Sequence, residues 1–199
     1  MTIIAILRGV KPAEVLAVAD CLVQCGITTI EVPLNSPEPL LSIRLLADHF
    51  SGRAVVGAGT VLTPDQAEAV AQAGATLVLS PNTDVKVITR TRELGLRSIP
   101  GVATPSEAFQ ALAAGAHALK LFPADVLGVA SLNAWRSVLP SSVQVVAVGG
   151  IDAGNAAAFI AAGAVSVGVG SSLYKPGQAL EQTRAAAMQL VNSLLPARA

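Results

Sequence analysis

The chain has 199 residues, of which 52% are hydrophobic and 13% are charged, and its formal net charge is zero. This length suits one sizeable core, so we expect a single domain over residues 1–199. The neutral balance and the lack of basic runs argue against nucleic acid and anionic membranes as partners. No apolar run reaches the roughly 18 residues of a membrane span, and we expect a cytoplasmic protein.

The low share of charged residues bears on assembly. Globular domains usually carry about 25% charged residues, so this chain has few charges with which to cover an isolated surface. Large uncharged, apolar surfaces are often buried against a partner. We therefore expect part of the surface to be buried between subunits.

Glycines recur where alanine- and leucine-rich segments end and short β-branched runs begin. A glycine just beyond a helix adopts the left-handed conformation that ends it, so each one predicts a helix end followed by a strand. Successive instances lie about twenty residues apart in the middle of the chain, the size of one helix–strand unit. The glycines are Gly26, Gly74, Gly95, Gly115 and Gly163.

Eight short apolar runs read as strands, and a helix-like segment follows each. Such alternation predicts a parallel sheet covered by helices, and eight units predict closure into a (β/α)8 TIM barrel. A doubly wound open sheet is the structural alternative. The expected strands are Ile3–Leu7, Thr29–Pro33, Ala54–Ala58, Leu77–Ser80, Arg97–Pro100, Ala118–Phe122, Val145–Val148 and Ser166–Val169.

Lys120 is the only one of four lysines inside a predicted strand. The two-residue period of a strand turns Leu119 and Leu121 towards the helices. Lys120 then points into the barrel with Ala118 and Phe122. Burial lowers the pKa of a lysine towards the neutral amine that attacks a ketone. A structural ion pair is the alternative role for this side chain.

Two further charged side chains share the inward parity. Glu31 alternates with Ile30 and Val32, so it faces the barrel interior. It could balance the charge of Lys120, serve as a general acid/base, or do both. Arg8 ends the first strand, where its guanidinium could hold a substrate carboxylate or simply be solvated.

Glycine-rich segments stand at three predicted strand tips, where barrels carry their chemistry. Gly57–Thr60 ends the third strand and is a weak signal by itself. Val148–Gly150 and Gly168–Ser172 end the seventh and eighth strands, where barrels commonly bind phosphate through backbone N–H groups. Ordinary turn glycines are the alternative, but two such tips side by side favour phosphate binding.

Other chemistries lack their markers. His49 and His117 do not pair at metal-ligand spacing, acidic residues do not cluster, and no Gly-x-Ser-x-Gly segment is present. We therefore expect no metal site and no serine hydrolase. Cys21 and Cys25 lie four residues apart on one face of a predicted helix, which favours a reduced, half-buried pair over a metal or redox role.

Five segments together resemble the successive strand tips of the class I (Schiff-base) aldolases of 2-keto-3-deoxy-6-phosphogluconate and -galactonate. The likeness runs in order over almost the whole chain. No single segment is decisive, but the set is highly specific. The segments are Ile4–Gly9, Glu31–Ser36, Gly57–Leu62, Leu119–Pro123 and Val148–Gly150.

The resemblance implies a role for each site residue. Lys120 would form the Schiff base and Glu31 would transfer protons, while Arg8 and Thr60 would contact the pyruvate portion of a small phosphorylated keto acid. Gly149, Gly150, Gly170 and Ser171 would hold the phosphate. The resemblance implies no metal or organic cofactor, and it implies a homotrimer.

The segments also bear on which epimer is cleaved. The gluconate-type pattern has Leu-Arg-Thr after the strand-two glutamate and a threonine before the glycine pair, whereas this chain has Leu34–Ser36 and Val148. That departure favours the galactonate substrate. A gluconate or 4-hydroxy-2-oxoglutarate aldolase, another phosphate-binding barrel isomerase or synthase, and a non-catalytic sugar-phosphate-binding barrel are the alternatives.

Overall fold

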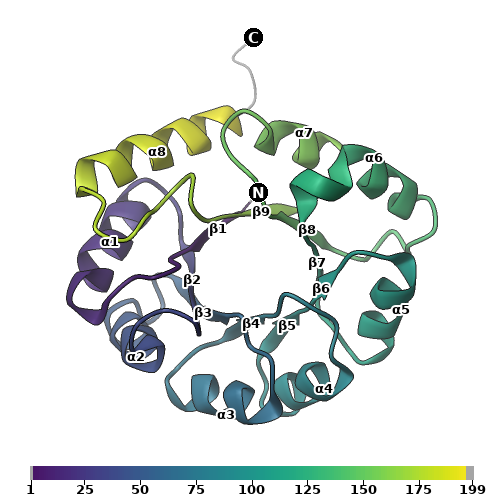
Figure 1. Cartoon of the computed structure of the whole chain (residues 1–199), viewed down its shortest axis with the longest axis horizontal. Helices are drawn as coiled ribbons and strands as arrows, with labels where there is room; N and C mark the ends of the chain where they lie inside the picture. Colours follow the sequence, from purple (N-terminus) through teal and green to yellow (C-terminus); the bar gives the residue numbers. More distant parts are fainter. Residues whose placement is uncertain (1, 196–199) are drawn as a thin grey trace.

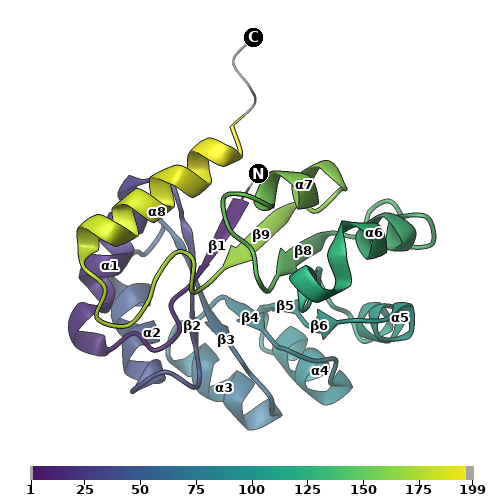
Figure 2. The ribbon, with the colours of Figure 1, turned by 45° about the horizontal axis from the view of Figure 1, so that its top comes forward.

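The computed structural model describes residues 2–195 and shows a ring of parallel strands surrounded by helices (Figure 1). Both ends of the predicted 1–199 domain, residue 1 and residues 196–199, lie outside the described residues. The strand tips lead into helices that return along the outside of the ring (Figure 2), except where one strand continues directly into the next. The predicted (β/α)8 barrel is confirmed, and the open-sheet alternative is wrong.

The described residues form nine strands and eight helices. The strands are β1 Thr2–Ile6, β2 Thr29–Pro33, β3 Val55–Gly59, β4 Leu77–Leu79, β5 Arg97–Ile99, β6 Gly101–Val102, β7 Leu119–Leu121, β8 Val145–Val148 and β9 Ser166–Val169. The helices are α1 Pro12–Gln24, α2 Pro39–His49, α3 Pro64–Gln72, α4 Val85–Glu93, α5 Pro105–Ala113, α6 Ala124–Arg136, α7 Ala156–Ala161 and α8 Leu180–Ser193.

The prediction of eight strands is wrong in one place, because the fifth strand is divided into β5 and β6. Pro100 lies between them and has no N–H to donate to a ladder. β5 pairs with β4 and β6 pairs with β7. The ring still closes across the break, since the N–H of Lys120 donates to the Pro100 carbonyl at 2.9 Å.

Side-chain alternation divides the core into two layers, as predicted. Leu119 and Leu121 belong to the outer layer between strands and helices. Ala118 lies in the inner layer, and Phe122 packs against it. Ile4 and Ile6 also belong to the inner layer. Arg8 comes two residues after Ile6, so the same alternation directs its side chain to the mouth of the barrel.

The helix-ending glycines were predicted correctly. Gly26, Gly74, Gly95, Gly115 and Gly163 each follow a helix with φ between 74° and 99°. At the first of them the N–H of Gly26 donates to the carbonyl of Val23 at 2.9 Å. These turns bring each chain segment back to the amino end of the barrel, so the opposite end is free to carry the site.

Arginines from the even-numbered helices cover the ends of the next helices at the amino end of the barrel. A cation is favoured there because helix carbonyls leave partial negative charge at a carboxyl terminus. The four contacts are Arg44 with the Gln72 carbonyl, Arg92 over Gly115, Arg136 with the Gly163 carbonyl, and Arg184 with the Gln24 side chain.

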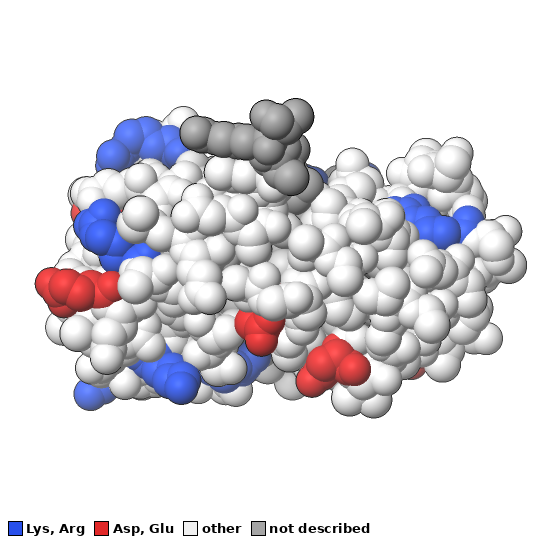
Figure 3. Space-filling model, turned by 90° about the horizontal axis from the view of Figure 1, so that it is seen from above, with Lys and Arg blue, Asp and Glu red and all other residues white. Residues whose placement is uncertain are grey.

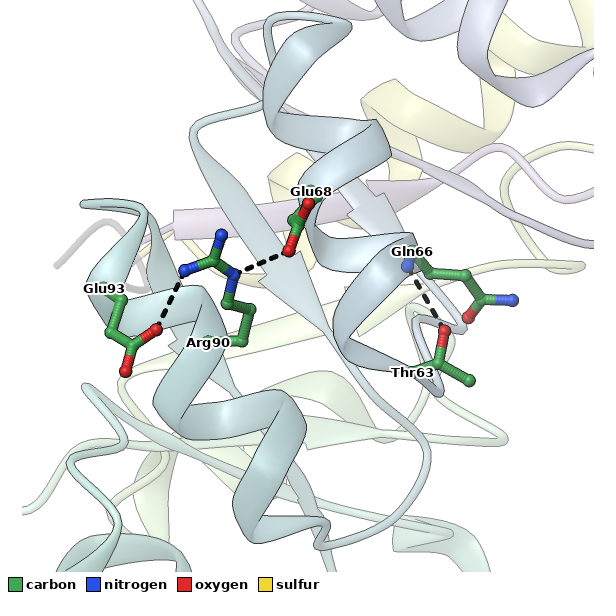
Figure 4. A network of polar contacts seen from close by, with 5 residues as sticks. All are labelled: Thr63, Gln66, Glu68, Arg90 and Glu93. Carbon is green, nitrogen blue, oxygen red and sulfur yellow. Dashed lines mark hydrogen bonds and ion pairs between the residues drawn. The ribbon is translucent and has the colours of Figure 1, made fainter.

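Salt bridges are few in the described part of the chain. Arg90 on α4 donates to Glu68 and to Glu93, each at 2.9 Å, and joins α3 to α4 (Figure 4). Thr63 caps α3 in the same view, accepting the N–H of Gln66 at 3.2 Å. No helix within residues 2–195 is long and apolar enough to cross a membrane.

Candidate active site

One cavity of about 330 Å³ opens at the carboxyl ends of the strands. Seven of the nine predicted site residues line it, contributed by β1, β7, β8, β9 and the turns that follow them. They are Arg8, Lys120, Val148, Gly149, Gly150, Gly170 and Ser171. Glu31 and Thr60 are not part of its lining.

Lys120 lies in the middle of β7 and is only 6% exposed. Its Nζ is 4.5 Å from the centre of the Phe122 ring, which accommodates an amine or ammonium over its face. Burial lowers the pKa of Lys120, and Arg8 lowers it further, whereas Glu31 opposes both effects. The site therefore favours a larger neutral fraction of this amine than water would.

Glu31 lies on β2 and is 2% exposed. Burial raises its pKa from 4.5 to about 7, although Lys120 and Arg8 act in the opposite direction. Its Oε2 has no hydrogen-bond partner among the described residues. A buried, unsatisfied carboxyl oxygen with a pKa near neutrality can gain or lose a proton readily, as a general acid/base must.

Gly59 makes room for this carboxyl group. A Cβ atom at position 59 would lie 1.9 Å from Oε2 of Glu31 and 2.5 Å from its Cδ. Thr60, the next residue, has φ of 57°, a left-handed conformation that is uncommon for threonine. Gly59 at the end of β3 thus leaves the space that the Glu31 carboxyl group occupies. Thr60, the residue after it, is half-buried.

Arg8 stands at the exposed mouth of the cavity, just beyond β1. Its Nη1 donates to Oδ1 of Asn35 at 2.6 Å. The N–H of Gly9 donates to Oγ of Ser36 at 3.0 Å, so the segments that follow β1 and β2 are joined by two hydrogen bonds to side chains. Arg8 is therefore held at the cavity, which favours a ligand-binding role over simple solvation.

The two glycine-rich tips, after β8 and β9, form a further part of the cavity wall. Gly149 and Gly150 have φ of 103° and 61°, and a Cβ at position 150 would lie 2.3 Å from Asp125. The Gly170 carbonyl accepts the N–H groups of Leu173 and Tyr174, at 2.8 and 3.0 Å, forming one helical turn. The first N–H groups of such a turn have no acceptor within it and suit an anion.

Sequence reasoning missed two residues of the site. Asn35 holds Arg8, yet a single asparagine in a loop carries no signal that an arginine 27 positions earlier in the chain will reach it. Asp152 lines the cavity, and its Oδ1 accepts the N–H groups of Gly154 and Asn155 at 2.7 and 3.2 Å. The Asp-x-Gly-Asn spacing is a turn signal that could have been read as such.

The remaining candidate groups lie elsewhere. His49 contacts Asp20, and His117 contacts Arg92 at the amino end of the barrel. Cys21 is buried, Cys25 is half-buried, and both are free thiols, as predicted. Within residues 2–195 no group of three or more histidine, cysteine or acidic side chains is arranged to hold a metal ion.

Comparison with known proteins gives a consistent result. Residues 1–190 match the family model described as KDPG and KHG aldolase, where KDPG is 2-keto-3-deoxy-6-phosphogluconate. The chain is 43% identical to the 2-dehydro-3-deoxy-6-phosphogalactonate aldolase of Escherichia coli (strain K12), over 97% of this chain and 94% of that protein. It is 47% identical to a probable enzyme of the same name from Rhizobium meliloti (strain 1021), over 92% of this chain and 86% of that protein.

A solved structure agrees with these relatives. The structure described as "Native KDPGal structure" superposes with a TM-score of 0.95 at 43% identity, covering 97% of this chain and 94% of that one. The chain therefore belongs to the KDPG and KHG aldolase family.

Proposed function

We propose that this protein is a class I aldolase that cleaves 2-keto-3-deoxy-6-phosphogalactonate to pyruvate and D-glyceraldehyde 3-phosphate. The observation that carries the proposal is a buried lysine, Lys120, that lines a phosphate-suited cavity and interacts electrostatically with a buried carboxyl group of raised pKa, Glu31. The names of the two relatives support the substrate. A purely structural role does not explain this pair of buried charges, since apolar side chains at both positions would avoid the free-energy cost of desolvating them.

Imine formation would begin with the neutral amine of Lys120. Its Nζ adds to the C2 carbonyl carbon, and a proton moves from nitrogen to oxygen to give a carbinolamine. Protonated Glu31 then donates its proton to the C2 hydroxyl group, which leaves as water. The products of this step are a protonated imine on Lys120 and a Glu31 carboxylate.

Cleavage would use the same two groups. The Glu31 carboxylate accepts the proton of the C4 hydroxyl group as the C3–C4 bond breaks, and the bonding electrons pass into the imine to give an enamine. Glyceraldehyde 3-phosphate leaves. Glu31 returns its proton to C3 of the enamine and then accepts a proton from the water that adds at C2. The resulting carbinolamine transfers its hydroxyl proton to the nitrogen and breaks down, which releases pyruvate and regenerates neutral Lys120.

The other cavity residues would bind the two ends of the substrate. Arg8 and Thr60 would contact the pyruvate portion, and the tips at Gly149–Gly150 and Gly170–Ser171 would hold the phosphate. Arg8 offers a planar set of donors that matches a carboxylate. The backbone N–H groups at the two tips suit a dianion because they are fixed and uncharged.

Borohydride reduction in the presence of pyruvate tests this assignment. We expect one reduced adduct per chain, located on Lys120, because this is the only lysine within the described strands. Peptide mass spectrometry locates the adduct. An adduct on Lys11, Lys86 or Lys175, or no adduct at all, would contradict the proposal.

Val148 is the basis of the epimer preference. It lines the cavity and is 3% exposed, and its side chain cannot form a hydrogen bond to a substrate hydroxyl. A C4 hydroxyl directed at Val148 would be left unpaired at a cost of about 1–3 kcal/mol, which corresponds to roughly ten- to hundredfold discrimination. We propose that this disfavours the gluconate epimer.

Val148→Thr is expected to shift the ratio of kcat/KM for the two epimers towards the gluconate substrate. Threonine keeps the branched shape and adds the missing hydroxyl. Parallel kinetics on both epimers measure the ratio for wild type and variant. A wild-type preference for the gluconate epimer, or an unchanged ratio in the variant, would contradict the role of Val148.

We also propose that the protein is a cytoplasmic homotrimer. The family resemblance supports the assembly, and the surface is consistent with it, since the face in Figure 3 carries few charged side chains. Several large apolar side chains are exposed, among them Val126 at 77%, Val138 at 56% and Met188 at 53%. Burial of such side chains between subunits would remove them from water.

A further inference from the structure

The Arg8–Asn35 hydrogen bond fixes which side of the cavity Arg8 occupies. In the sheet β1 lies between β9 and β2. Asn35 follows β2, and its Oδ1 accepts the Arg8 Nη1–H at 2.6 Å. The guanidinium is thereby drawn towards β2, the strand of Glu31, and away from the tip of β9, which carries Gly170 and Ser171.

The charge of Arg8 is not neutralised by this contact. Asn35 is uncharged, and none of the salt bridges among the described residues includes Arg8. Arg8 lowers the pKa of both Glu31 and Lys120, so its positive charge acts on both groups. An aspartate at position 35 could form the same hydrogen bond, but it would cancel the charge that an anionic ligand needs.

An arginine has five N–H donors in a planar arrangement, and Asn35 accepts a hydrogen bond from one of the nitrogens of Arg8. The free donors remain available at the cavity, which Arg8 lines together with Lys120. The phosphate-suited tips lie on the β8 and β9 side of the same cavity. The two sides of the cavity thus present different donors, a guanidinium cation on one side and backbone N–H groups on the other.

We propose that Asn35 is a positioning residue that holds Arg8 on the β2 side of the cavity, so that Arg8 binds the carboxylate of the keto acid and not its phosphate. This inference rests on the proposed aldolase function. It assigns a role to a side chain that is not part of the cavity lining. Without Asn35, the long arginine side chain would regain rotamer freedom, and a carboxylate would have to restore the order on binding.

The test compares the two ends of the substrate in purified full-length protein. The pyruvate concentration that gives half-maximal borohydride trapping reports the carboxylate end, and inhibition of cleavage by inorganic phosphate reports the other end. Asn35→Ala is expected to raise the first about tenfold and to change the second less than about twofold. Arg8→Met should raise the first by roughly ten- to hundredfold.

Two comparisons separate positioning from a structural role. In the Arg8→Met background, Asn35→Ala should have no further effect on pyruvate, because the two residues act as one unit. Ser36→Ala is the matched control, since it removes the neighbouring hydrogen bond to Gly9 and leaves Arg8–Asn35 intact. It should leave half-saturation by pyruvate within about twofold of wild type.

The possible failures are distinguishable. With normal trapping in the wild type, three results would each overturn the positioning role. Asn35→Ala could weaken pyruvate trapping and phosphate inhibition equally, or its effect on pyruvate could add fully to that of Arg8→Met. Ser36→Ala could also weaken pyruvate trapping as much as Asn35→Ala does. Absence of trapping in the wild type would overturn the aldolase proposal and this inference with it.

Discussion

Replacing Lys120 with arginine is expected to abolish pyruvate trapping and to lower turnover by roughly 10⁴-fold or more. Arginine keeps the positive charge beside Glu31, but its guanidinium is protonated at every relevant pH and cannot add to a ketone. Trapping followed by mass spectrometry and steady-state kinetics measure the two effects. Retained trapping at any lysine would show that Lys120 is not the nucleophile.

A second variant covers the case in which arginine does not fit. Lys120 is buried, and the larger guanidinium could disturb the packing against Phe122. Lys120→Met has a similar length and no charge, and removal of the lysine charge raises the pKa of Glu31, which then stays protonated. Both variants should lack activity, and thermal unfolding should show that at least the methionine variant is folded.

The parity of single strands was sufficient to predict which charged side chains of the candidate site face the barrel interior. Alternation placed Lys120 and Glu31 inside the barrel and Leu119 and Leu121 outside, because a strand embedded in a sheet has only two faces. Glycines predicted the helix ends for an equally local reason, since the left-handed conformation depends on one residue. Such features need no knowledge of the rest of the fold.

Features that depend on two distant segments were not predicted. The Arg8–Asn35 hydrogen bond joins residues 27 positions apart, and its existence depends on the register of β1 against β2. The division of the fifth strand at Pro100 depends on the register of that strand against β7, because the register decides which carbonyls accept the N–H groups of β7. The role of Gly59 likewise follows from the register that sets its strand beside Glu31, and only coordinates reveal the space it leaves.

Glu31→Gln is expected to lower turnover by roughly 10²–10⁴-fold, because glutamine keeps the size of the side chain but cannot exchange a proton. Binding of a phosphorylated substrate analogue should change much less, since glutamine keeps the size and the hydrogen-bonding capacity of the side chain. Steady-state kinetics and a binding titration separate the two. Turnover within a few-fold of wild type would assign the proton transfers to another group.

The pH dependence provides an independent check of Glu31. Burial raises its pKa from 4.5 to about 7, so the protonated form that releases water from the carbinolamine persists up to that pH. The wild-type rate of imine formation should therefore fall as the pH rises through about 7, and Glu31→Gln should lack this decrease.

Because the folded state holds the Glu31 proton more tightly than the unfolded state, the stability from this group is present below pH 4.5 and is lost as the pH rises through about 7. The glutamine variant should thus be at least as stable as wild type at pH 8.

Gly59→Ala should impair the same step without changing Glu31 itself. The added methyl group would lie 1.9 Å from Oε2 of Glu31, so the carboxyl group must move, and a displacement of about 1 Å can cost roughly 10²-fold in rate. Gly57→Ala is the matched control on the same strand, since the three atoms nearest to its Cβ, from 3.0 Å, would all belong to Leu77. In the Glu31→Gln background the Gly59 substitution should cost little more, because the proton transfer it disturbs is already absent. A full additional loss there would mean that Gly59 acts on the cavity by another route.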